Sequence, residues 1–554
     1  MLEPDKAANA PSQNKIIDLA AAEGHDADIP TNLGTATPTE TTVPPSRTSS
    51  NADEREFREK DLVDIEKGRD YGSTPGTEDK EHNVTEKDIS HETDPNIVDF
   101  TPGDPENPLN WSAARKWWSV ALVSLITLLT PLGSSMFAPG VPQLMEDYGS
   151  TNNLLAGFVV SVYVLGFAFG PLVIAPLSEM YGRLPLYHTC NVLFVIWNLA
   201  CGFAPNLSSL IVFRFFAGTF GSAPLALGGG TIADMITQEH RGTAMALWMS
   251  GPTAGPVIGP IAGGFISQTI GWRWCFYSLS IAAALTTAGS MAVMRESYGV
   301  AILNKRVARL RKETGNPNLR SKLDKGLTSK QLFLYSIVRP AKMLTRSPIV
   351  LLLSIYVAIV YTYLYILFTT FTVVFRDNYG FTTGTAGLAY LGIGVGAILG
   401  QIVYTLWGNH HARTRMAKGT FKPEDRLPLM FPGAIAMPVG LFWYGWSVQA
   451  HVHWICPIIG TTFVGFGLLM IFMAPNTYLV DVFTLHAASA MAANTVLRSV
   501  VAAIVPLAGE KMFATLGLGW GASLLGFVAI ACIPIPIFFI KYGERIRTKY
   551  PVKL

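Results

Sequence analysis

The chain has 554 residues, of which 49% are hydrophobic and 15% charged, and its formal net charge is +3 at pH 7. A mean hydropathy of +0.32 is unusual for a soluble chain of this length, so composition argues for a membrane protein and against a water-soluble one. The five cysteines follow no paired spacing, and we therefore expect neither a disulfide framework nor a metal site.

Residues 1–110 predict a disordered acidic tail on the cytoplasmic side. The stretch is rich in Asp, Glu, Ser, Thr and Pro, has few aromatics, and carries 25 acidic against 10 basic residues. Such a composition cannot bury enough apolar surface to fold. No basic stretch followed by an apolar one occurs near Met1, so a cleaved secretory signal is not indicated and insertion is expected to use an internal span.

From Trp117 onward, apolar windows of roughly 18 to 25 residues recur, each long enough to cross a hydrocarbon core of about 30 Å as a helix. They predict an all-α membrane protein with twelve transmembrane helices in two pseudo-symmetric six-helix bundles, at residues 111–294 and 348–541. The expected spans are 117–138, 154–177, 186–204, 210–233, 243–267, 274–294, 349–375, 386–407, 429–446, 454–478, 487–507 and 520–540.

Between the two sets, residues 295–347 form a polar segment with thirteen Lys or Arg against three acids. Together with the other Lys and Arg near span ends, this basic linker falls on one side of the predicted membrane, as the positive-inside rule requires of the cytoplasmic side. Both termini are then cytoplasmic, and residues 542–554 are a cytoplasmic C-terminal tail.

Residues 251–264 read GPTAGPVIGPIAGG, which places Gly-Pro pairs four residues apart within the fifth span. Neighbouring helices can satisfy the backbone groups that Pro frees inside a membrane. Glycines at this interval leave a bare face for another helix, and prolines fix bends that a moving bundle can use. We therefore expect Gly255, Pro256, Gly259 and Pro260 to act in gating. The alternative is a packing stripe of small residues with no dynamic role.

Charged residues mark the loop between the second and third spans. Glu179 and Arg183 are four apart across a turn that needs Gly182, and Asp234 ends the fourth span on the same side. These three charges predict a latch that holds this half in the outward-facing state and releases when it is protonated or strained, although they can also serve only to fix topology. The sequence RLPLY at 183–187 is echoed by RLPLM at 426–430, which supports a duplication of the two halves.

Two arginines lie within predicted spans, where a central Arg costs roughly 2.5 to 3.5 kcal/mol on insertion scales. Arg214 is expected to face a cavity or a partner. Arg498 is a candidate lining residue, with packing against helix-end carbonyls as the alternative of nearly equal weight. No Asp or Glu falls clearly at mid-span in the first half, so the sequence assigns no proton carrier.

The seventh span carries the aromatics that most suggest a substrate site. Tyr361, Tyr365 and Phe368 share one helical face, and aromatic faces with hydroxyl tips suit flat apolar or cationic compounds. An aromatic stripe can equally be packing or an interfacial belt. Asn476 and Asn494 are further candidates, because lipid would penalise their amides.

Several stretches resemble the major facilitator superfamily, and within it the twelve-span fungal drug:proton antiporters. The stretches are DPENPLNWS at 104–112, the signature loop at 170–183 with Glu179 where Asp is commoner, LIVFRFFAGTFGS at 210–222, the Gly-Pro ladder, RLPLMFPGA at 426–434 and NTYLVDVF at 476–483. The resemblance covers residues 104 to the C-terminus. It implies a part in proton coupling for Arg214 and associates the Gly-Pro ladder with antiporters.

We accordingly expect a plasma-membrane exporter, or alternatively a vacuolar one, that drives small amphipathic drugs, toxins or secondary metabolites outward by proton antiport and alternating access. The expected partners are a small-molecule substrate and the lipid bilayer, with no nucleic acid and no cofactor beyond the proton gradient, and the expected state is a monomer. Alternatives are a proton-coupled nutrient or polyamine transporter of the same fold and a non-transporting sensor. No GxxxxGK[ST] loop supports an ATP-driven pump, and no nucleophile with a nearby base supports an enzyme.

Overall fold

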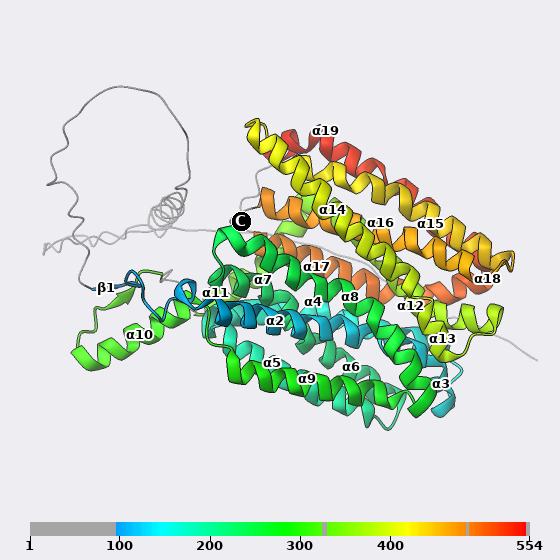
Figure 1. Cartoon of the computed structure of the whole chain (residues 1–554), viewed down its shortest axis with the longest axis horizontal. Helices are drawn as coiled ribbons and strands as arrows, with labels where there is room; N and C mark the ends of the chain where they lie inside the picture. The colour runs from blue at the N-terminus through cyan, green and yellow to red at the C-terminus, as the bar shows by residue number, and fades with distance from the viewer. Residues whose placement is uncertain (1–95, 324–328, 484–486, 550–554) are drawn as a thin grey trace, which may run out of the picture. The chain divides into compact units, whose positions relative to one another are not determined.

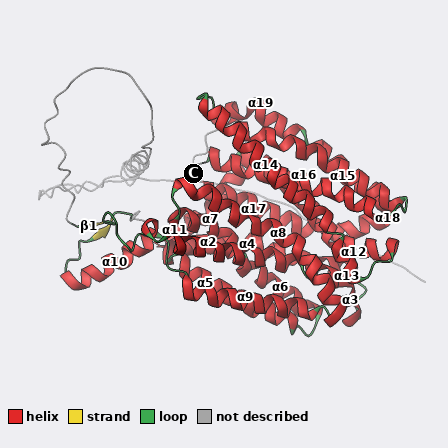
Figure 2. Cartoon of the chain, viewed as in Figure 1, coloured by secondary structure: helices red, strands yellow, loops and turns green. Residues whose placement is uncertain are grey.

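The computed structural model describes residues 96–323, 329–483 and 487–549, and these are very largely helical (Figure 2). Residues 1–95, most of the predicted tail, lie outside the described residues. Figure 1 shows the helices running side by side, with the blue-to-green helices of the first half grouped together and the yellow-to-red helices of the second half grouped together.

The first half begins after Trp111 and contains eight described helices and one 3-10 turn. They are α2 (Ala113–Ser135), η2 (Ala138–Gly140), α3 (Val141–Asp147), α4 (Asn153–Tyr181), α5 (Arg183–Gly202), α6 (Leu207–Gly221), α7 (Ala223–Met235), α8 (Gln238–Ile270) and α9 (Arg273–Val293). Pro131 in α2 and the Gly-Pro ladder in α8 interrupt backbone hydrogen bonding without ending their helices.

The second half follows the same plan. It contains α12 (Pro348–Tyr379), α13 (Thr383–Leu388), α14 (Leu391–Ala417), η3 (Pro423–Met430), α15 (Phe431–Gln449), α16 (Ile455–Val482), α17 (Ala487–Ile504), η5 (Val505–Ala508), α18 (Gly509–Cys532) and α19 (Pro534–Lys549). Gly517 has a φ of 76° and breaks α18, a conformation that favours glycine.

Ten helical segments of the described residues are long and apolar enough to cross a membrane. The last of them, Ala487–Lys549, contains both α17 and α18–α19, so it accounts for two of the predicted spans. The Pro-rich α8 supplies the fifth. The architecture is therefore the predicted all-α membrane fold with two six-helix bundles.

The glycine face of α8 lies directly against α2. A Cβ added at Gly251 would sit 3.0 Å from the Ser124 carbonyl oxygen, and one added at Gly255 would sit 2.9 Å from the Leu132 nitrogen. Gly259 and Gly263 continue this face against Ser135 and Met136. The four-residue interval thus gives the close helix contact that the sequence predicts, because no larger side chain fits between the two backbones.

The polar segments differ from their predicted boundaries. Residues 96–110, assigned to the disordered tail, contain β1 (Ile97–Val98) and η1 (Pro108–Asn110). β1 pairs in parallel with β2 (Arg320–Ser321) in the linker, which also forms α10 (Gly299–Thr314) and α11 (Ser329–Arg346). Residues 96–110 are therefore structured and do not belong to a disordered tail. At the other end, α19 continues through the predicted tail to Lys549.

A buried ion pair holds the 96–110 segment on the linker. Arg306 of α10 donates to Asp104 at 2.5 Å, and the Asp104 side chain is only 3% exposed. Arg306 and Arg309 also contact Glu106, and Lys322 contacts Asp99. Composition could not reveal this docking, because the acids of the tail find their partners about two hundred residues away.

The two bundles contact each other through α4 with α17, and through α8 with α13 and α14. Four hydrogen bonds of the described residues join them: Ser134 with Tyr365 at 2.9 Å, Ser161 with the Ala503 carbonyl at 2.7 Å, and Gln268 with the Gly384 backbone N–H at 2.8 Å and the Thr382 hydroxyl at 2.9 Å. Ser134, Gln268 and Ala503 lie in the last turns of their helices, which the predicted topology places on the extracellular side.

Candidate functional site

The predicted aromatic face of the seventh span exists and faces the protein interior. In α12, the Tyr361 and Tyr365 rings lie 5.3 Å apart, and Tyr365 meets Phe368 edge-on at 5.4 Å. Tyr365 and Phe368 are each 2% exposed. Their burial excludes an interfacial belt, so the stripe forms either core packing or the wall of a binding site.

Two asparagines on α16 and α17 join this aromatic group. The Asn494 side-chain amide donates to the Asn476 side-chain oxygen at 2.8 Å, and Asn476 in turn donates to the Phe472 carbonyl at 2.7 Å. Both amides are buried. Phe472 stacks on Tyr361 at 6.3 Å, which places the asparagines beside the aromatic face.

Arg498 completes this group, which we call the Arg498 cluster: Tyr361, Tyr365, Phe368, Phe472, Asn476, Asn494 and Arg498. The guanidinium carbon lies 4.6 Å from the Tyr361 ring centroid and 5.0 Å from that of Phe472. Arg498 is 9% exposed, and its Nε has no hydrogen-bond partner among the described residues. The alternative interpretation, packing against helix-end carbonyls, does not fit, since no described hydrogen bond joins Arg498 to a carbonyl.

Arg214 on α6 is buried in the other bundle and is held differently. Its Nε donates to the Val159 carbonyl at 2.6 Å and its Nη2 to the Ser134 carbonyl at 3.3 Å. Three rings surround the guanidinium carbon at 5.2 to 5.6 Å, those of Phe137, Tyr163 and Phe276. Two backbone carbonyls and three aromatic faces therefore offset the free-energy cost of burying the Arg214 charge in the membrane, as the sequence predicts.

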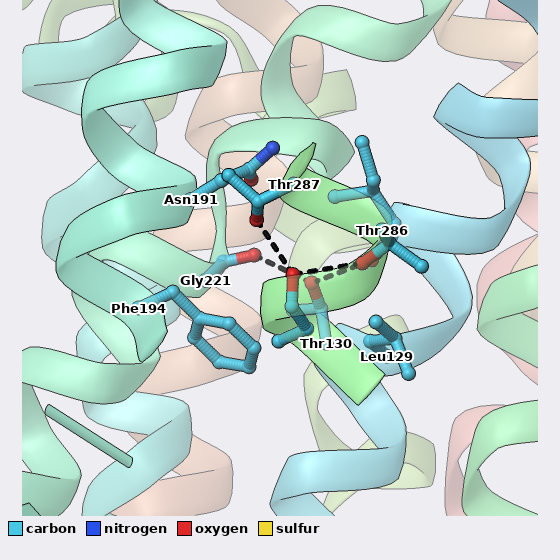
Figure 3. Close-up of a pocket in the computed structure, with 9 residues that line it drawn as sticks. Leu129, Thr130, Asn191, Phe194, Gly221, Thr286 and Thr287 are labelled. Carbon is cyan, nitrogen blue, oxygen red and sulfur yellow. Dashed lines mark hydrogen bonds between the residues drawn. The ribbon is translucent and has the colours of Figure 1, made fainter. Parts of the chain in front are cut away.

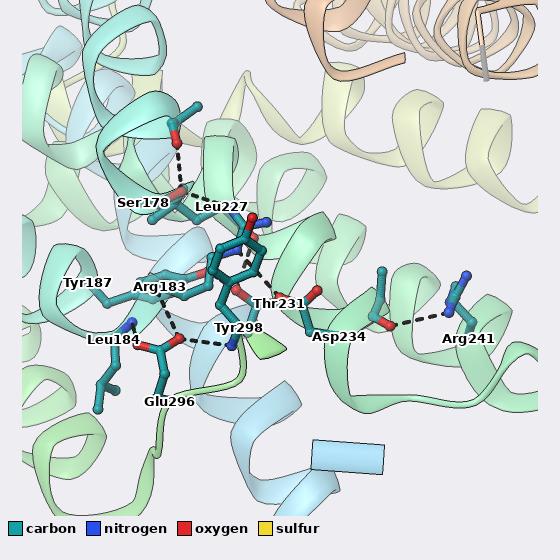
Figure 4. Close-up of polar contacts among 12 residues, drawn as sticks. Ser178, Arg183, Leu184, Tyr187, Leu227, Thr231, Asp234, Arg241, Glu296 and Tyr298 are labelled. Atoms are coloured by element: carbon teal, nitrogen blue, oxygen red, sulfur yellow. Dashed lines mark hydrogen bonds and ion pairs between the residues drawn. The ribbon is translucent and has the colours of Figure 1, made fainter. Parts of the chain in front are cut away.

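Figure 4 shows a charged group where α4 ends, α5 begins and α7 ends. The Arg183 Nε lies 3.5 Å from the Asp234 Oδ2, and Arg183 Nη1 donates to the Ser178 hydroxyl at 2.7 Å. The Arg183 guanidinium also lies over the Tyr298 ring at 4.9 Å, and burial raises the pKa of Tyr298 to about 12. Arg183 and Asp234 are therefore brought together as predicted.

Glu179, however, is not the acid that contacts the turn. No described hydrogen bond or ion pair joins it to Arg183, so the predicted contact between Glu179 and Arg183 is absent from this structure, and the latch stays a prediction. Glu296, at the start of the linker, takes the position instead. Its carboxylate accepts the backbone N–H groups of Arg183 at 2.9 Å and Leu184 at 3.0 Å, and so caps the start of α5 (Figure 4).

The second half repeats the arginine–aspartate pair. Arg426, at the start of the RLPLM sequence, donates to Asp481 at 3.0 Å near the end of α16. In both halves the arginine opens the third helix of the bundle and the aspartate ends the fourth. The signal in the sequence is the RLPL repeat together with the aspartate near the end of the next span, Asp234 in the first half and Asp481 in the second.

A small pocket lies inside the first bundle (Figure 3), and none of its lining residues belongs to the Arg498 cluster. Its volume of 10 Å³ holds about one water molecule. Thr130, Asn191, Thr286 and Thr287 supply its polar lining, and Thr130 donates to the Gly221 carbonyl at 2.7 Å. A site of this size fits a structural water and not a transported compound. Among the described residues, no group of three or more His, Cys, Asp or Glu side chains forms a metal site.

Comparison with known proteins agrees with the architecture. Residues 123–506 match the family model of the Major Facilitator Superfamily. The chain is 57% identical to the MFS-type transporter penM of Penicillium rubens, with 82% of this chain and 90% of that protein covered. It is 51% identical to the efflux pump radE of Floropilus chiversii, with 84% and 87% covered.

Solved structures show the same fold at low identity. The proton:xylose symporter XylE aligns with a TM-score of 0.58 at 16% identity, covering 79% of this chain and all of that one. A bacterial homologue of the lysosomal transporter Spinster, in an inward-facing conformation, aligns with a TM-score of 0.57 at 12% identity, covering 79% of this chain and 99% of that one.

Proposed function

The chain belongs to the major facilitator superfamily, and from that membership we propose that it exports small amphipathic compounds such as secondary metabolites by proton antiport. It is a multi-pass membrane transporter and not an enzyme. We further propose that it acts as a monomer in the plasma membrane with both termini in the cytoplasm.

The Arg498 cluster carries the proposal of an amphipathic substrate. It combines a buried aromatic face with two amides and one cation. All six residues for which the sequence predicts substrate binding belong to it. The face supplies apolar area and stacking, while the polar groups fix orientation. The name of the relative radE, an efflux pump, supports the outward direction.

Alternating access is supported by how the bundles meet. Ser134 and Gln268 lie in the last turns of α2 and α8, at the ends that the predicted topology places outside, and they contact Tyr365 and Gly384 of the other bundle. The pairs Arg183–Asp234 and Arg426–Asp481 lie within single bundles at the other ends. A protein that closes its outer side in this way releases substrate by breaking the outer contacts and forming inner ones.

The test is transport by the purified full chain in proteoliposomes with an imposed pH gradient and a panel of aromatic metabolites and drugs. Counter-movement of at least one compound against protons is expected, and it should stop when a protonophore collapses the gradient. Movement of substrate in the same direction as protons would replace antiport by symport. No movement of any compound, with folded protein in the vesicles, would overturn the transport proposal.

A further inference from the structure

Arg498 differs from every other arginine buried in the described helices by its lack of an acceptor. Arg214 donates to two carbonyls, and Arg183 and Arg426 each contact an aspartate. Arg498 takes part in no described ion pair or hydrogen bond. Arg498 as a whole is 9% exposed, so its unpaired guanidinium has lost most of its water without gaining a counter-charge.

The aromatic rings around Arg498 offset only part of this loss. Tyr361 and Phe472 face the guanidinium carbon at 4.6 and 5.0 Å, distances suited to cation–π attraction. Rings attract the charge but accept none of its N–H groups. The N–H groups of the planar Arg498 guanidinium therefore stay free to donate to two oxygens of a bound ligand.

Asn494 adds a second free group beside the arginine. Asn494 and Arg498 are four residues apart in α17 and so lie on one face of the helix. The Asn494 amide nitrogen is used by Asn476, whereas its oxygen is buried without a partner among the described residues. A ligand with a hydroxyl or N–H next to an anionic group would satisfy the oxygen and the guanidinium together.

We propose that the Arg498 cluster binds aromatic anions. The exported class then consists of flat compounds that bear a carboxylate or an equivalent acidic group, an inference that rests on the proposed function. The guanidinium of Arg498 pairs with the anion, the Tyr361 and Phe472 rings cover the aromatic body, and the Asn494 oxygen accepts a neighbouring donor. No carboxylate of the protein competes for Arg498 in the described contacts.

The experiment measures binding to the full chain in phosphatidylcholine nanodiscs by calorimetry. The probes are three matched pairs, benzoate with benzamide, 2-naphthoate with 2-naphthamide, and anthracene-9-carboxylate with anthracene-9-carboxamide. Each pair changes charge at nearly constant shape. At neutral pH we expect at least one carboxylate to bind about tenfold or more tightly than its amide, as a charge-assisted hydrogen bond gives.

Arg498→Gln should abolish this preference by weakening carboxylate binding more than amide binding, and Arg498→Lys should retain a reduced preference. Arg376→Gln is the matched control, because Arg376 is exposed and pairs only with Asp377. The thermal unfolding midpoint of each variant separates a lost site from a lost fold. If Arg498→Gln proves unstable, Arg498→Lys and Asn494→Leu carry the same comparison.

Equal affinity of wild type for carboxylates and amides, binding of neither, or an unchanged preference in Arg498→Gln would overturn the anion site. These outcomes are distinct from failure of the proposed function. Vesicles that move neutral compounds without charge preference keep export and reject the anion site. Nanodiscs that bind carboxylates through Arg498, while vesicles transport nothing, keep the anion site and reject export.

Discussion

The hydroxyl of Ser134 in α2 lies 2.9 Å from the hydroxyl of Tyr365 in α12, and this contact joins the two bundles. On one side, the Ser134 carbonyl accepts Arg214. On the other, the Tyr365 ring packs on Tyr361, which covers Arg498. The two buried arginines of the molecule's interior are therefore connected through a single hydrogen bond between bundles that would separate under the proposed alternating access.

Breaking this bond should favour the state in which the outer side is open. Tyr365→Phe removes about 1 kcal/mol of interaction from the outer-closed state only, since the partners move apart in the other state. A membrane-impermeant maleimide should then label a cysteine introduced at Thr385, beside the outer contact of Gln268, several-fold faster. The measurement uses a Cys456→Ser background, because Cys456 is the one partly exposed native cysteine.

Tyr363→Phe is the control for this prediction. The Tyr363 hydroxyl donates to the Leu525 carbonyl at 2.9 Å within the second bundle, so its loss costs a similar amount of energy without touching the interface. Labelling at Thr385 should stay at the wild-type rate in Tyr363→Phe. Equal acceleration in both variants would show that loosened packing, and not the contact with Ser134, controls access.

The glycine face of α8 predicts a graded response to larger side chains. Gly259→Leu and Gly263→Leu place atoms inside the backbone of α2, near Ser135 and Met136, and overpacking of this kind costs about 1 to 3 kcal/mol or prevents folding. Gly242→Leu lies in the same helix where nothing stands within 4 Å of the added Cβ. The measurement is the yield of monodisperse protein and its unfolding midpoint.

Comparable losses at Gly242 and Gly259 would show that helix propensity, and not the contact with α2, governs the effect. If Gly259→Leu instead folds normally and still fails to transport, the close contact is needed for motion and not for assembly. That outcome would favour the hinge interpretation of the Gly-Pro ladder over the packing stripe.

Much of the Arg498 cluster could be predicted from the sequence, because helical geometry alone sets which side chains share a face. Tyr361, Tyr365 and Phe368 follow the 3.6-residue period, and amides or charges in apolar spans are expected to turn away from lipid. Phe472 was not foreseen. Nothing in an apolar span distinguishes an aromatic that covers a cation from one that packs against a neighbouring helix.

The charged turn shows where sequence reasoning stops. Glu179 has the better local spacing to Arg183, yet Glu296, 113 residues further along, caps the turn. Gly182, with a φ of 99°, leads the chain into α5 with exposed N–H groups that need an acceptor, and the end of α9 delivers Glu296 to that place. Only the packing of α5 against α9 decides between the two acids.

This difference gives a direct comparison of the two glutamates. Glu296→Gln weakens charge-assisted hydrogen bonds to three backbone N–H groups, those of Arg183, Leu184 and Tyr298, and should destabilise the protein by about 1 to 3 kcal/mol. Glu179→Gln should change stability by no more than about 0.5 kcal/mol. The measurement is chemical denaturation of both variants in the same detergent. A larger loss of stability for Glu179→Gln than for Glu296→Gln would support the latch predicted from the sequence.

The repeated arginine–aspartate pairs predict matching coupling energies in the two halves. Both pairs are partly buried, with side-chain exposures of 14% and 22% for Arg183 and Asp234, and 21% and 28% for Arg426 and Asp481. Double-mutant cycles with Arg→Gln and Asp→Asn should give about 0.5 to 2 kcal/mol in each half and additive effects between halves. Strong coupling between Asp234 and Asp481 would instead indicate that the two ends meet in the measured state.

Acid should release the 96–110 segment from the linker. The side-chain hydrogen bond from Arg306 and the backbone N–H of Glu106 lower the pKa of Asp104 below its ordinary value of about 4. Because the folded-state pKa is depressed, this contact contributes its full stability above pH 4 and loses it as the pH falls through the lower folded value.

A spin label on a cysteine at Thr101 should become mobile only in that acidic range. Asp104→Asn, which carries no charge at any pH, should give the mobile spectrum already at pH 7, whereas Asp377→Asn on the far surface should not. A label that is equally immobile in Asp104→Asn would mean that the β1–β2 pairing alone holds the segment.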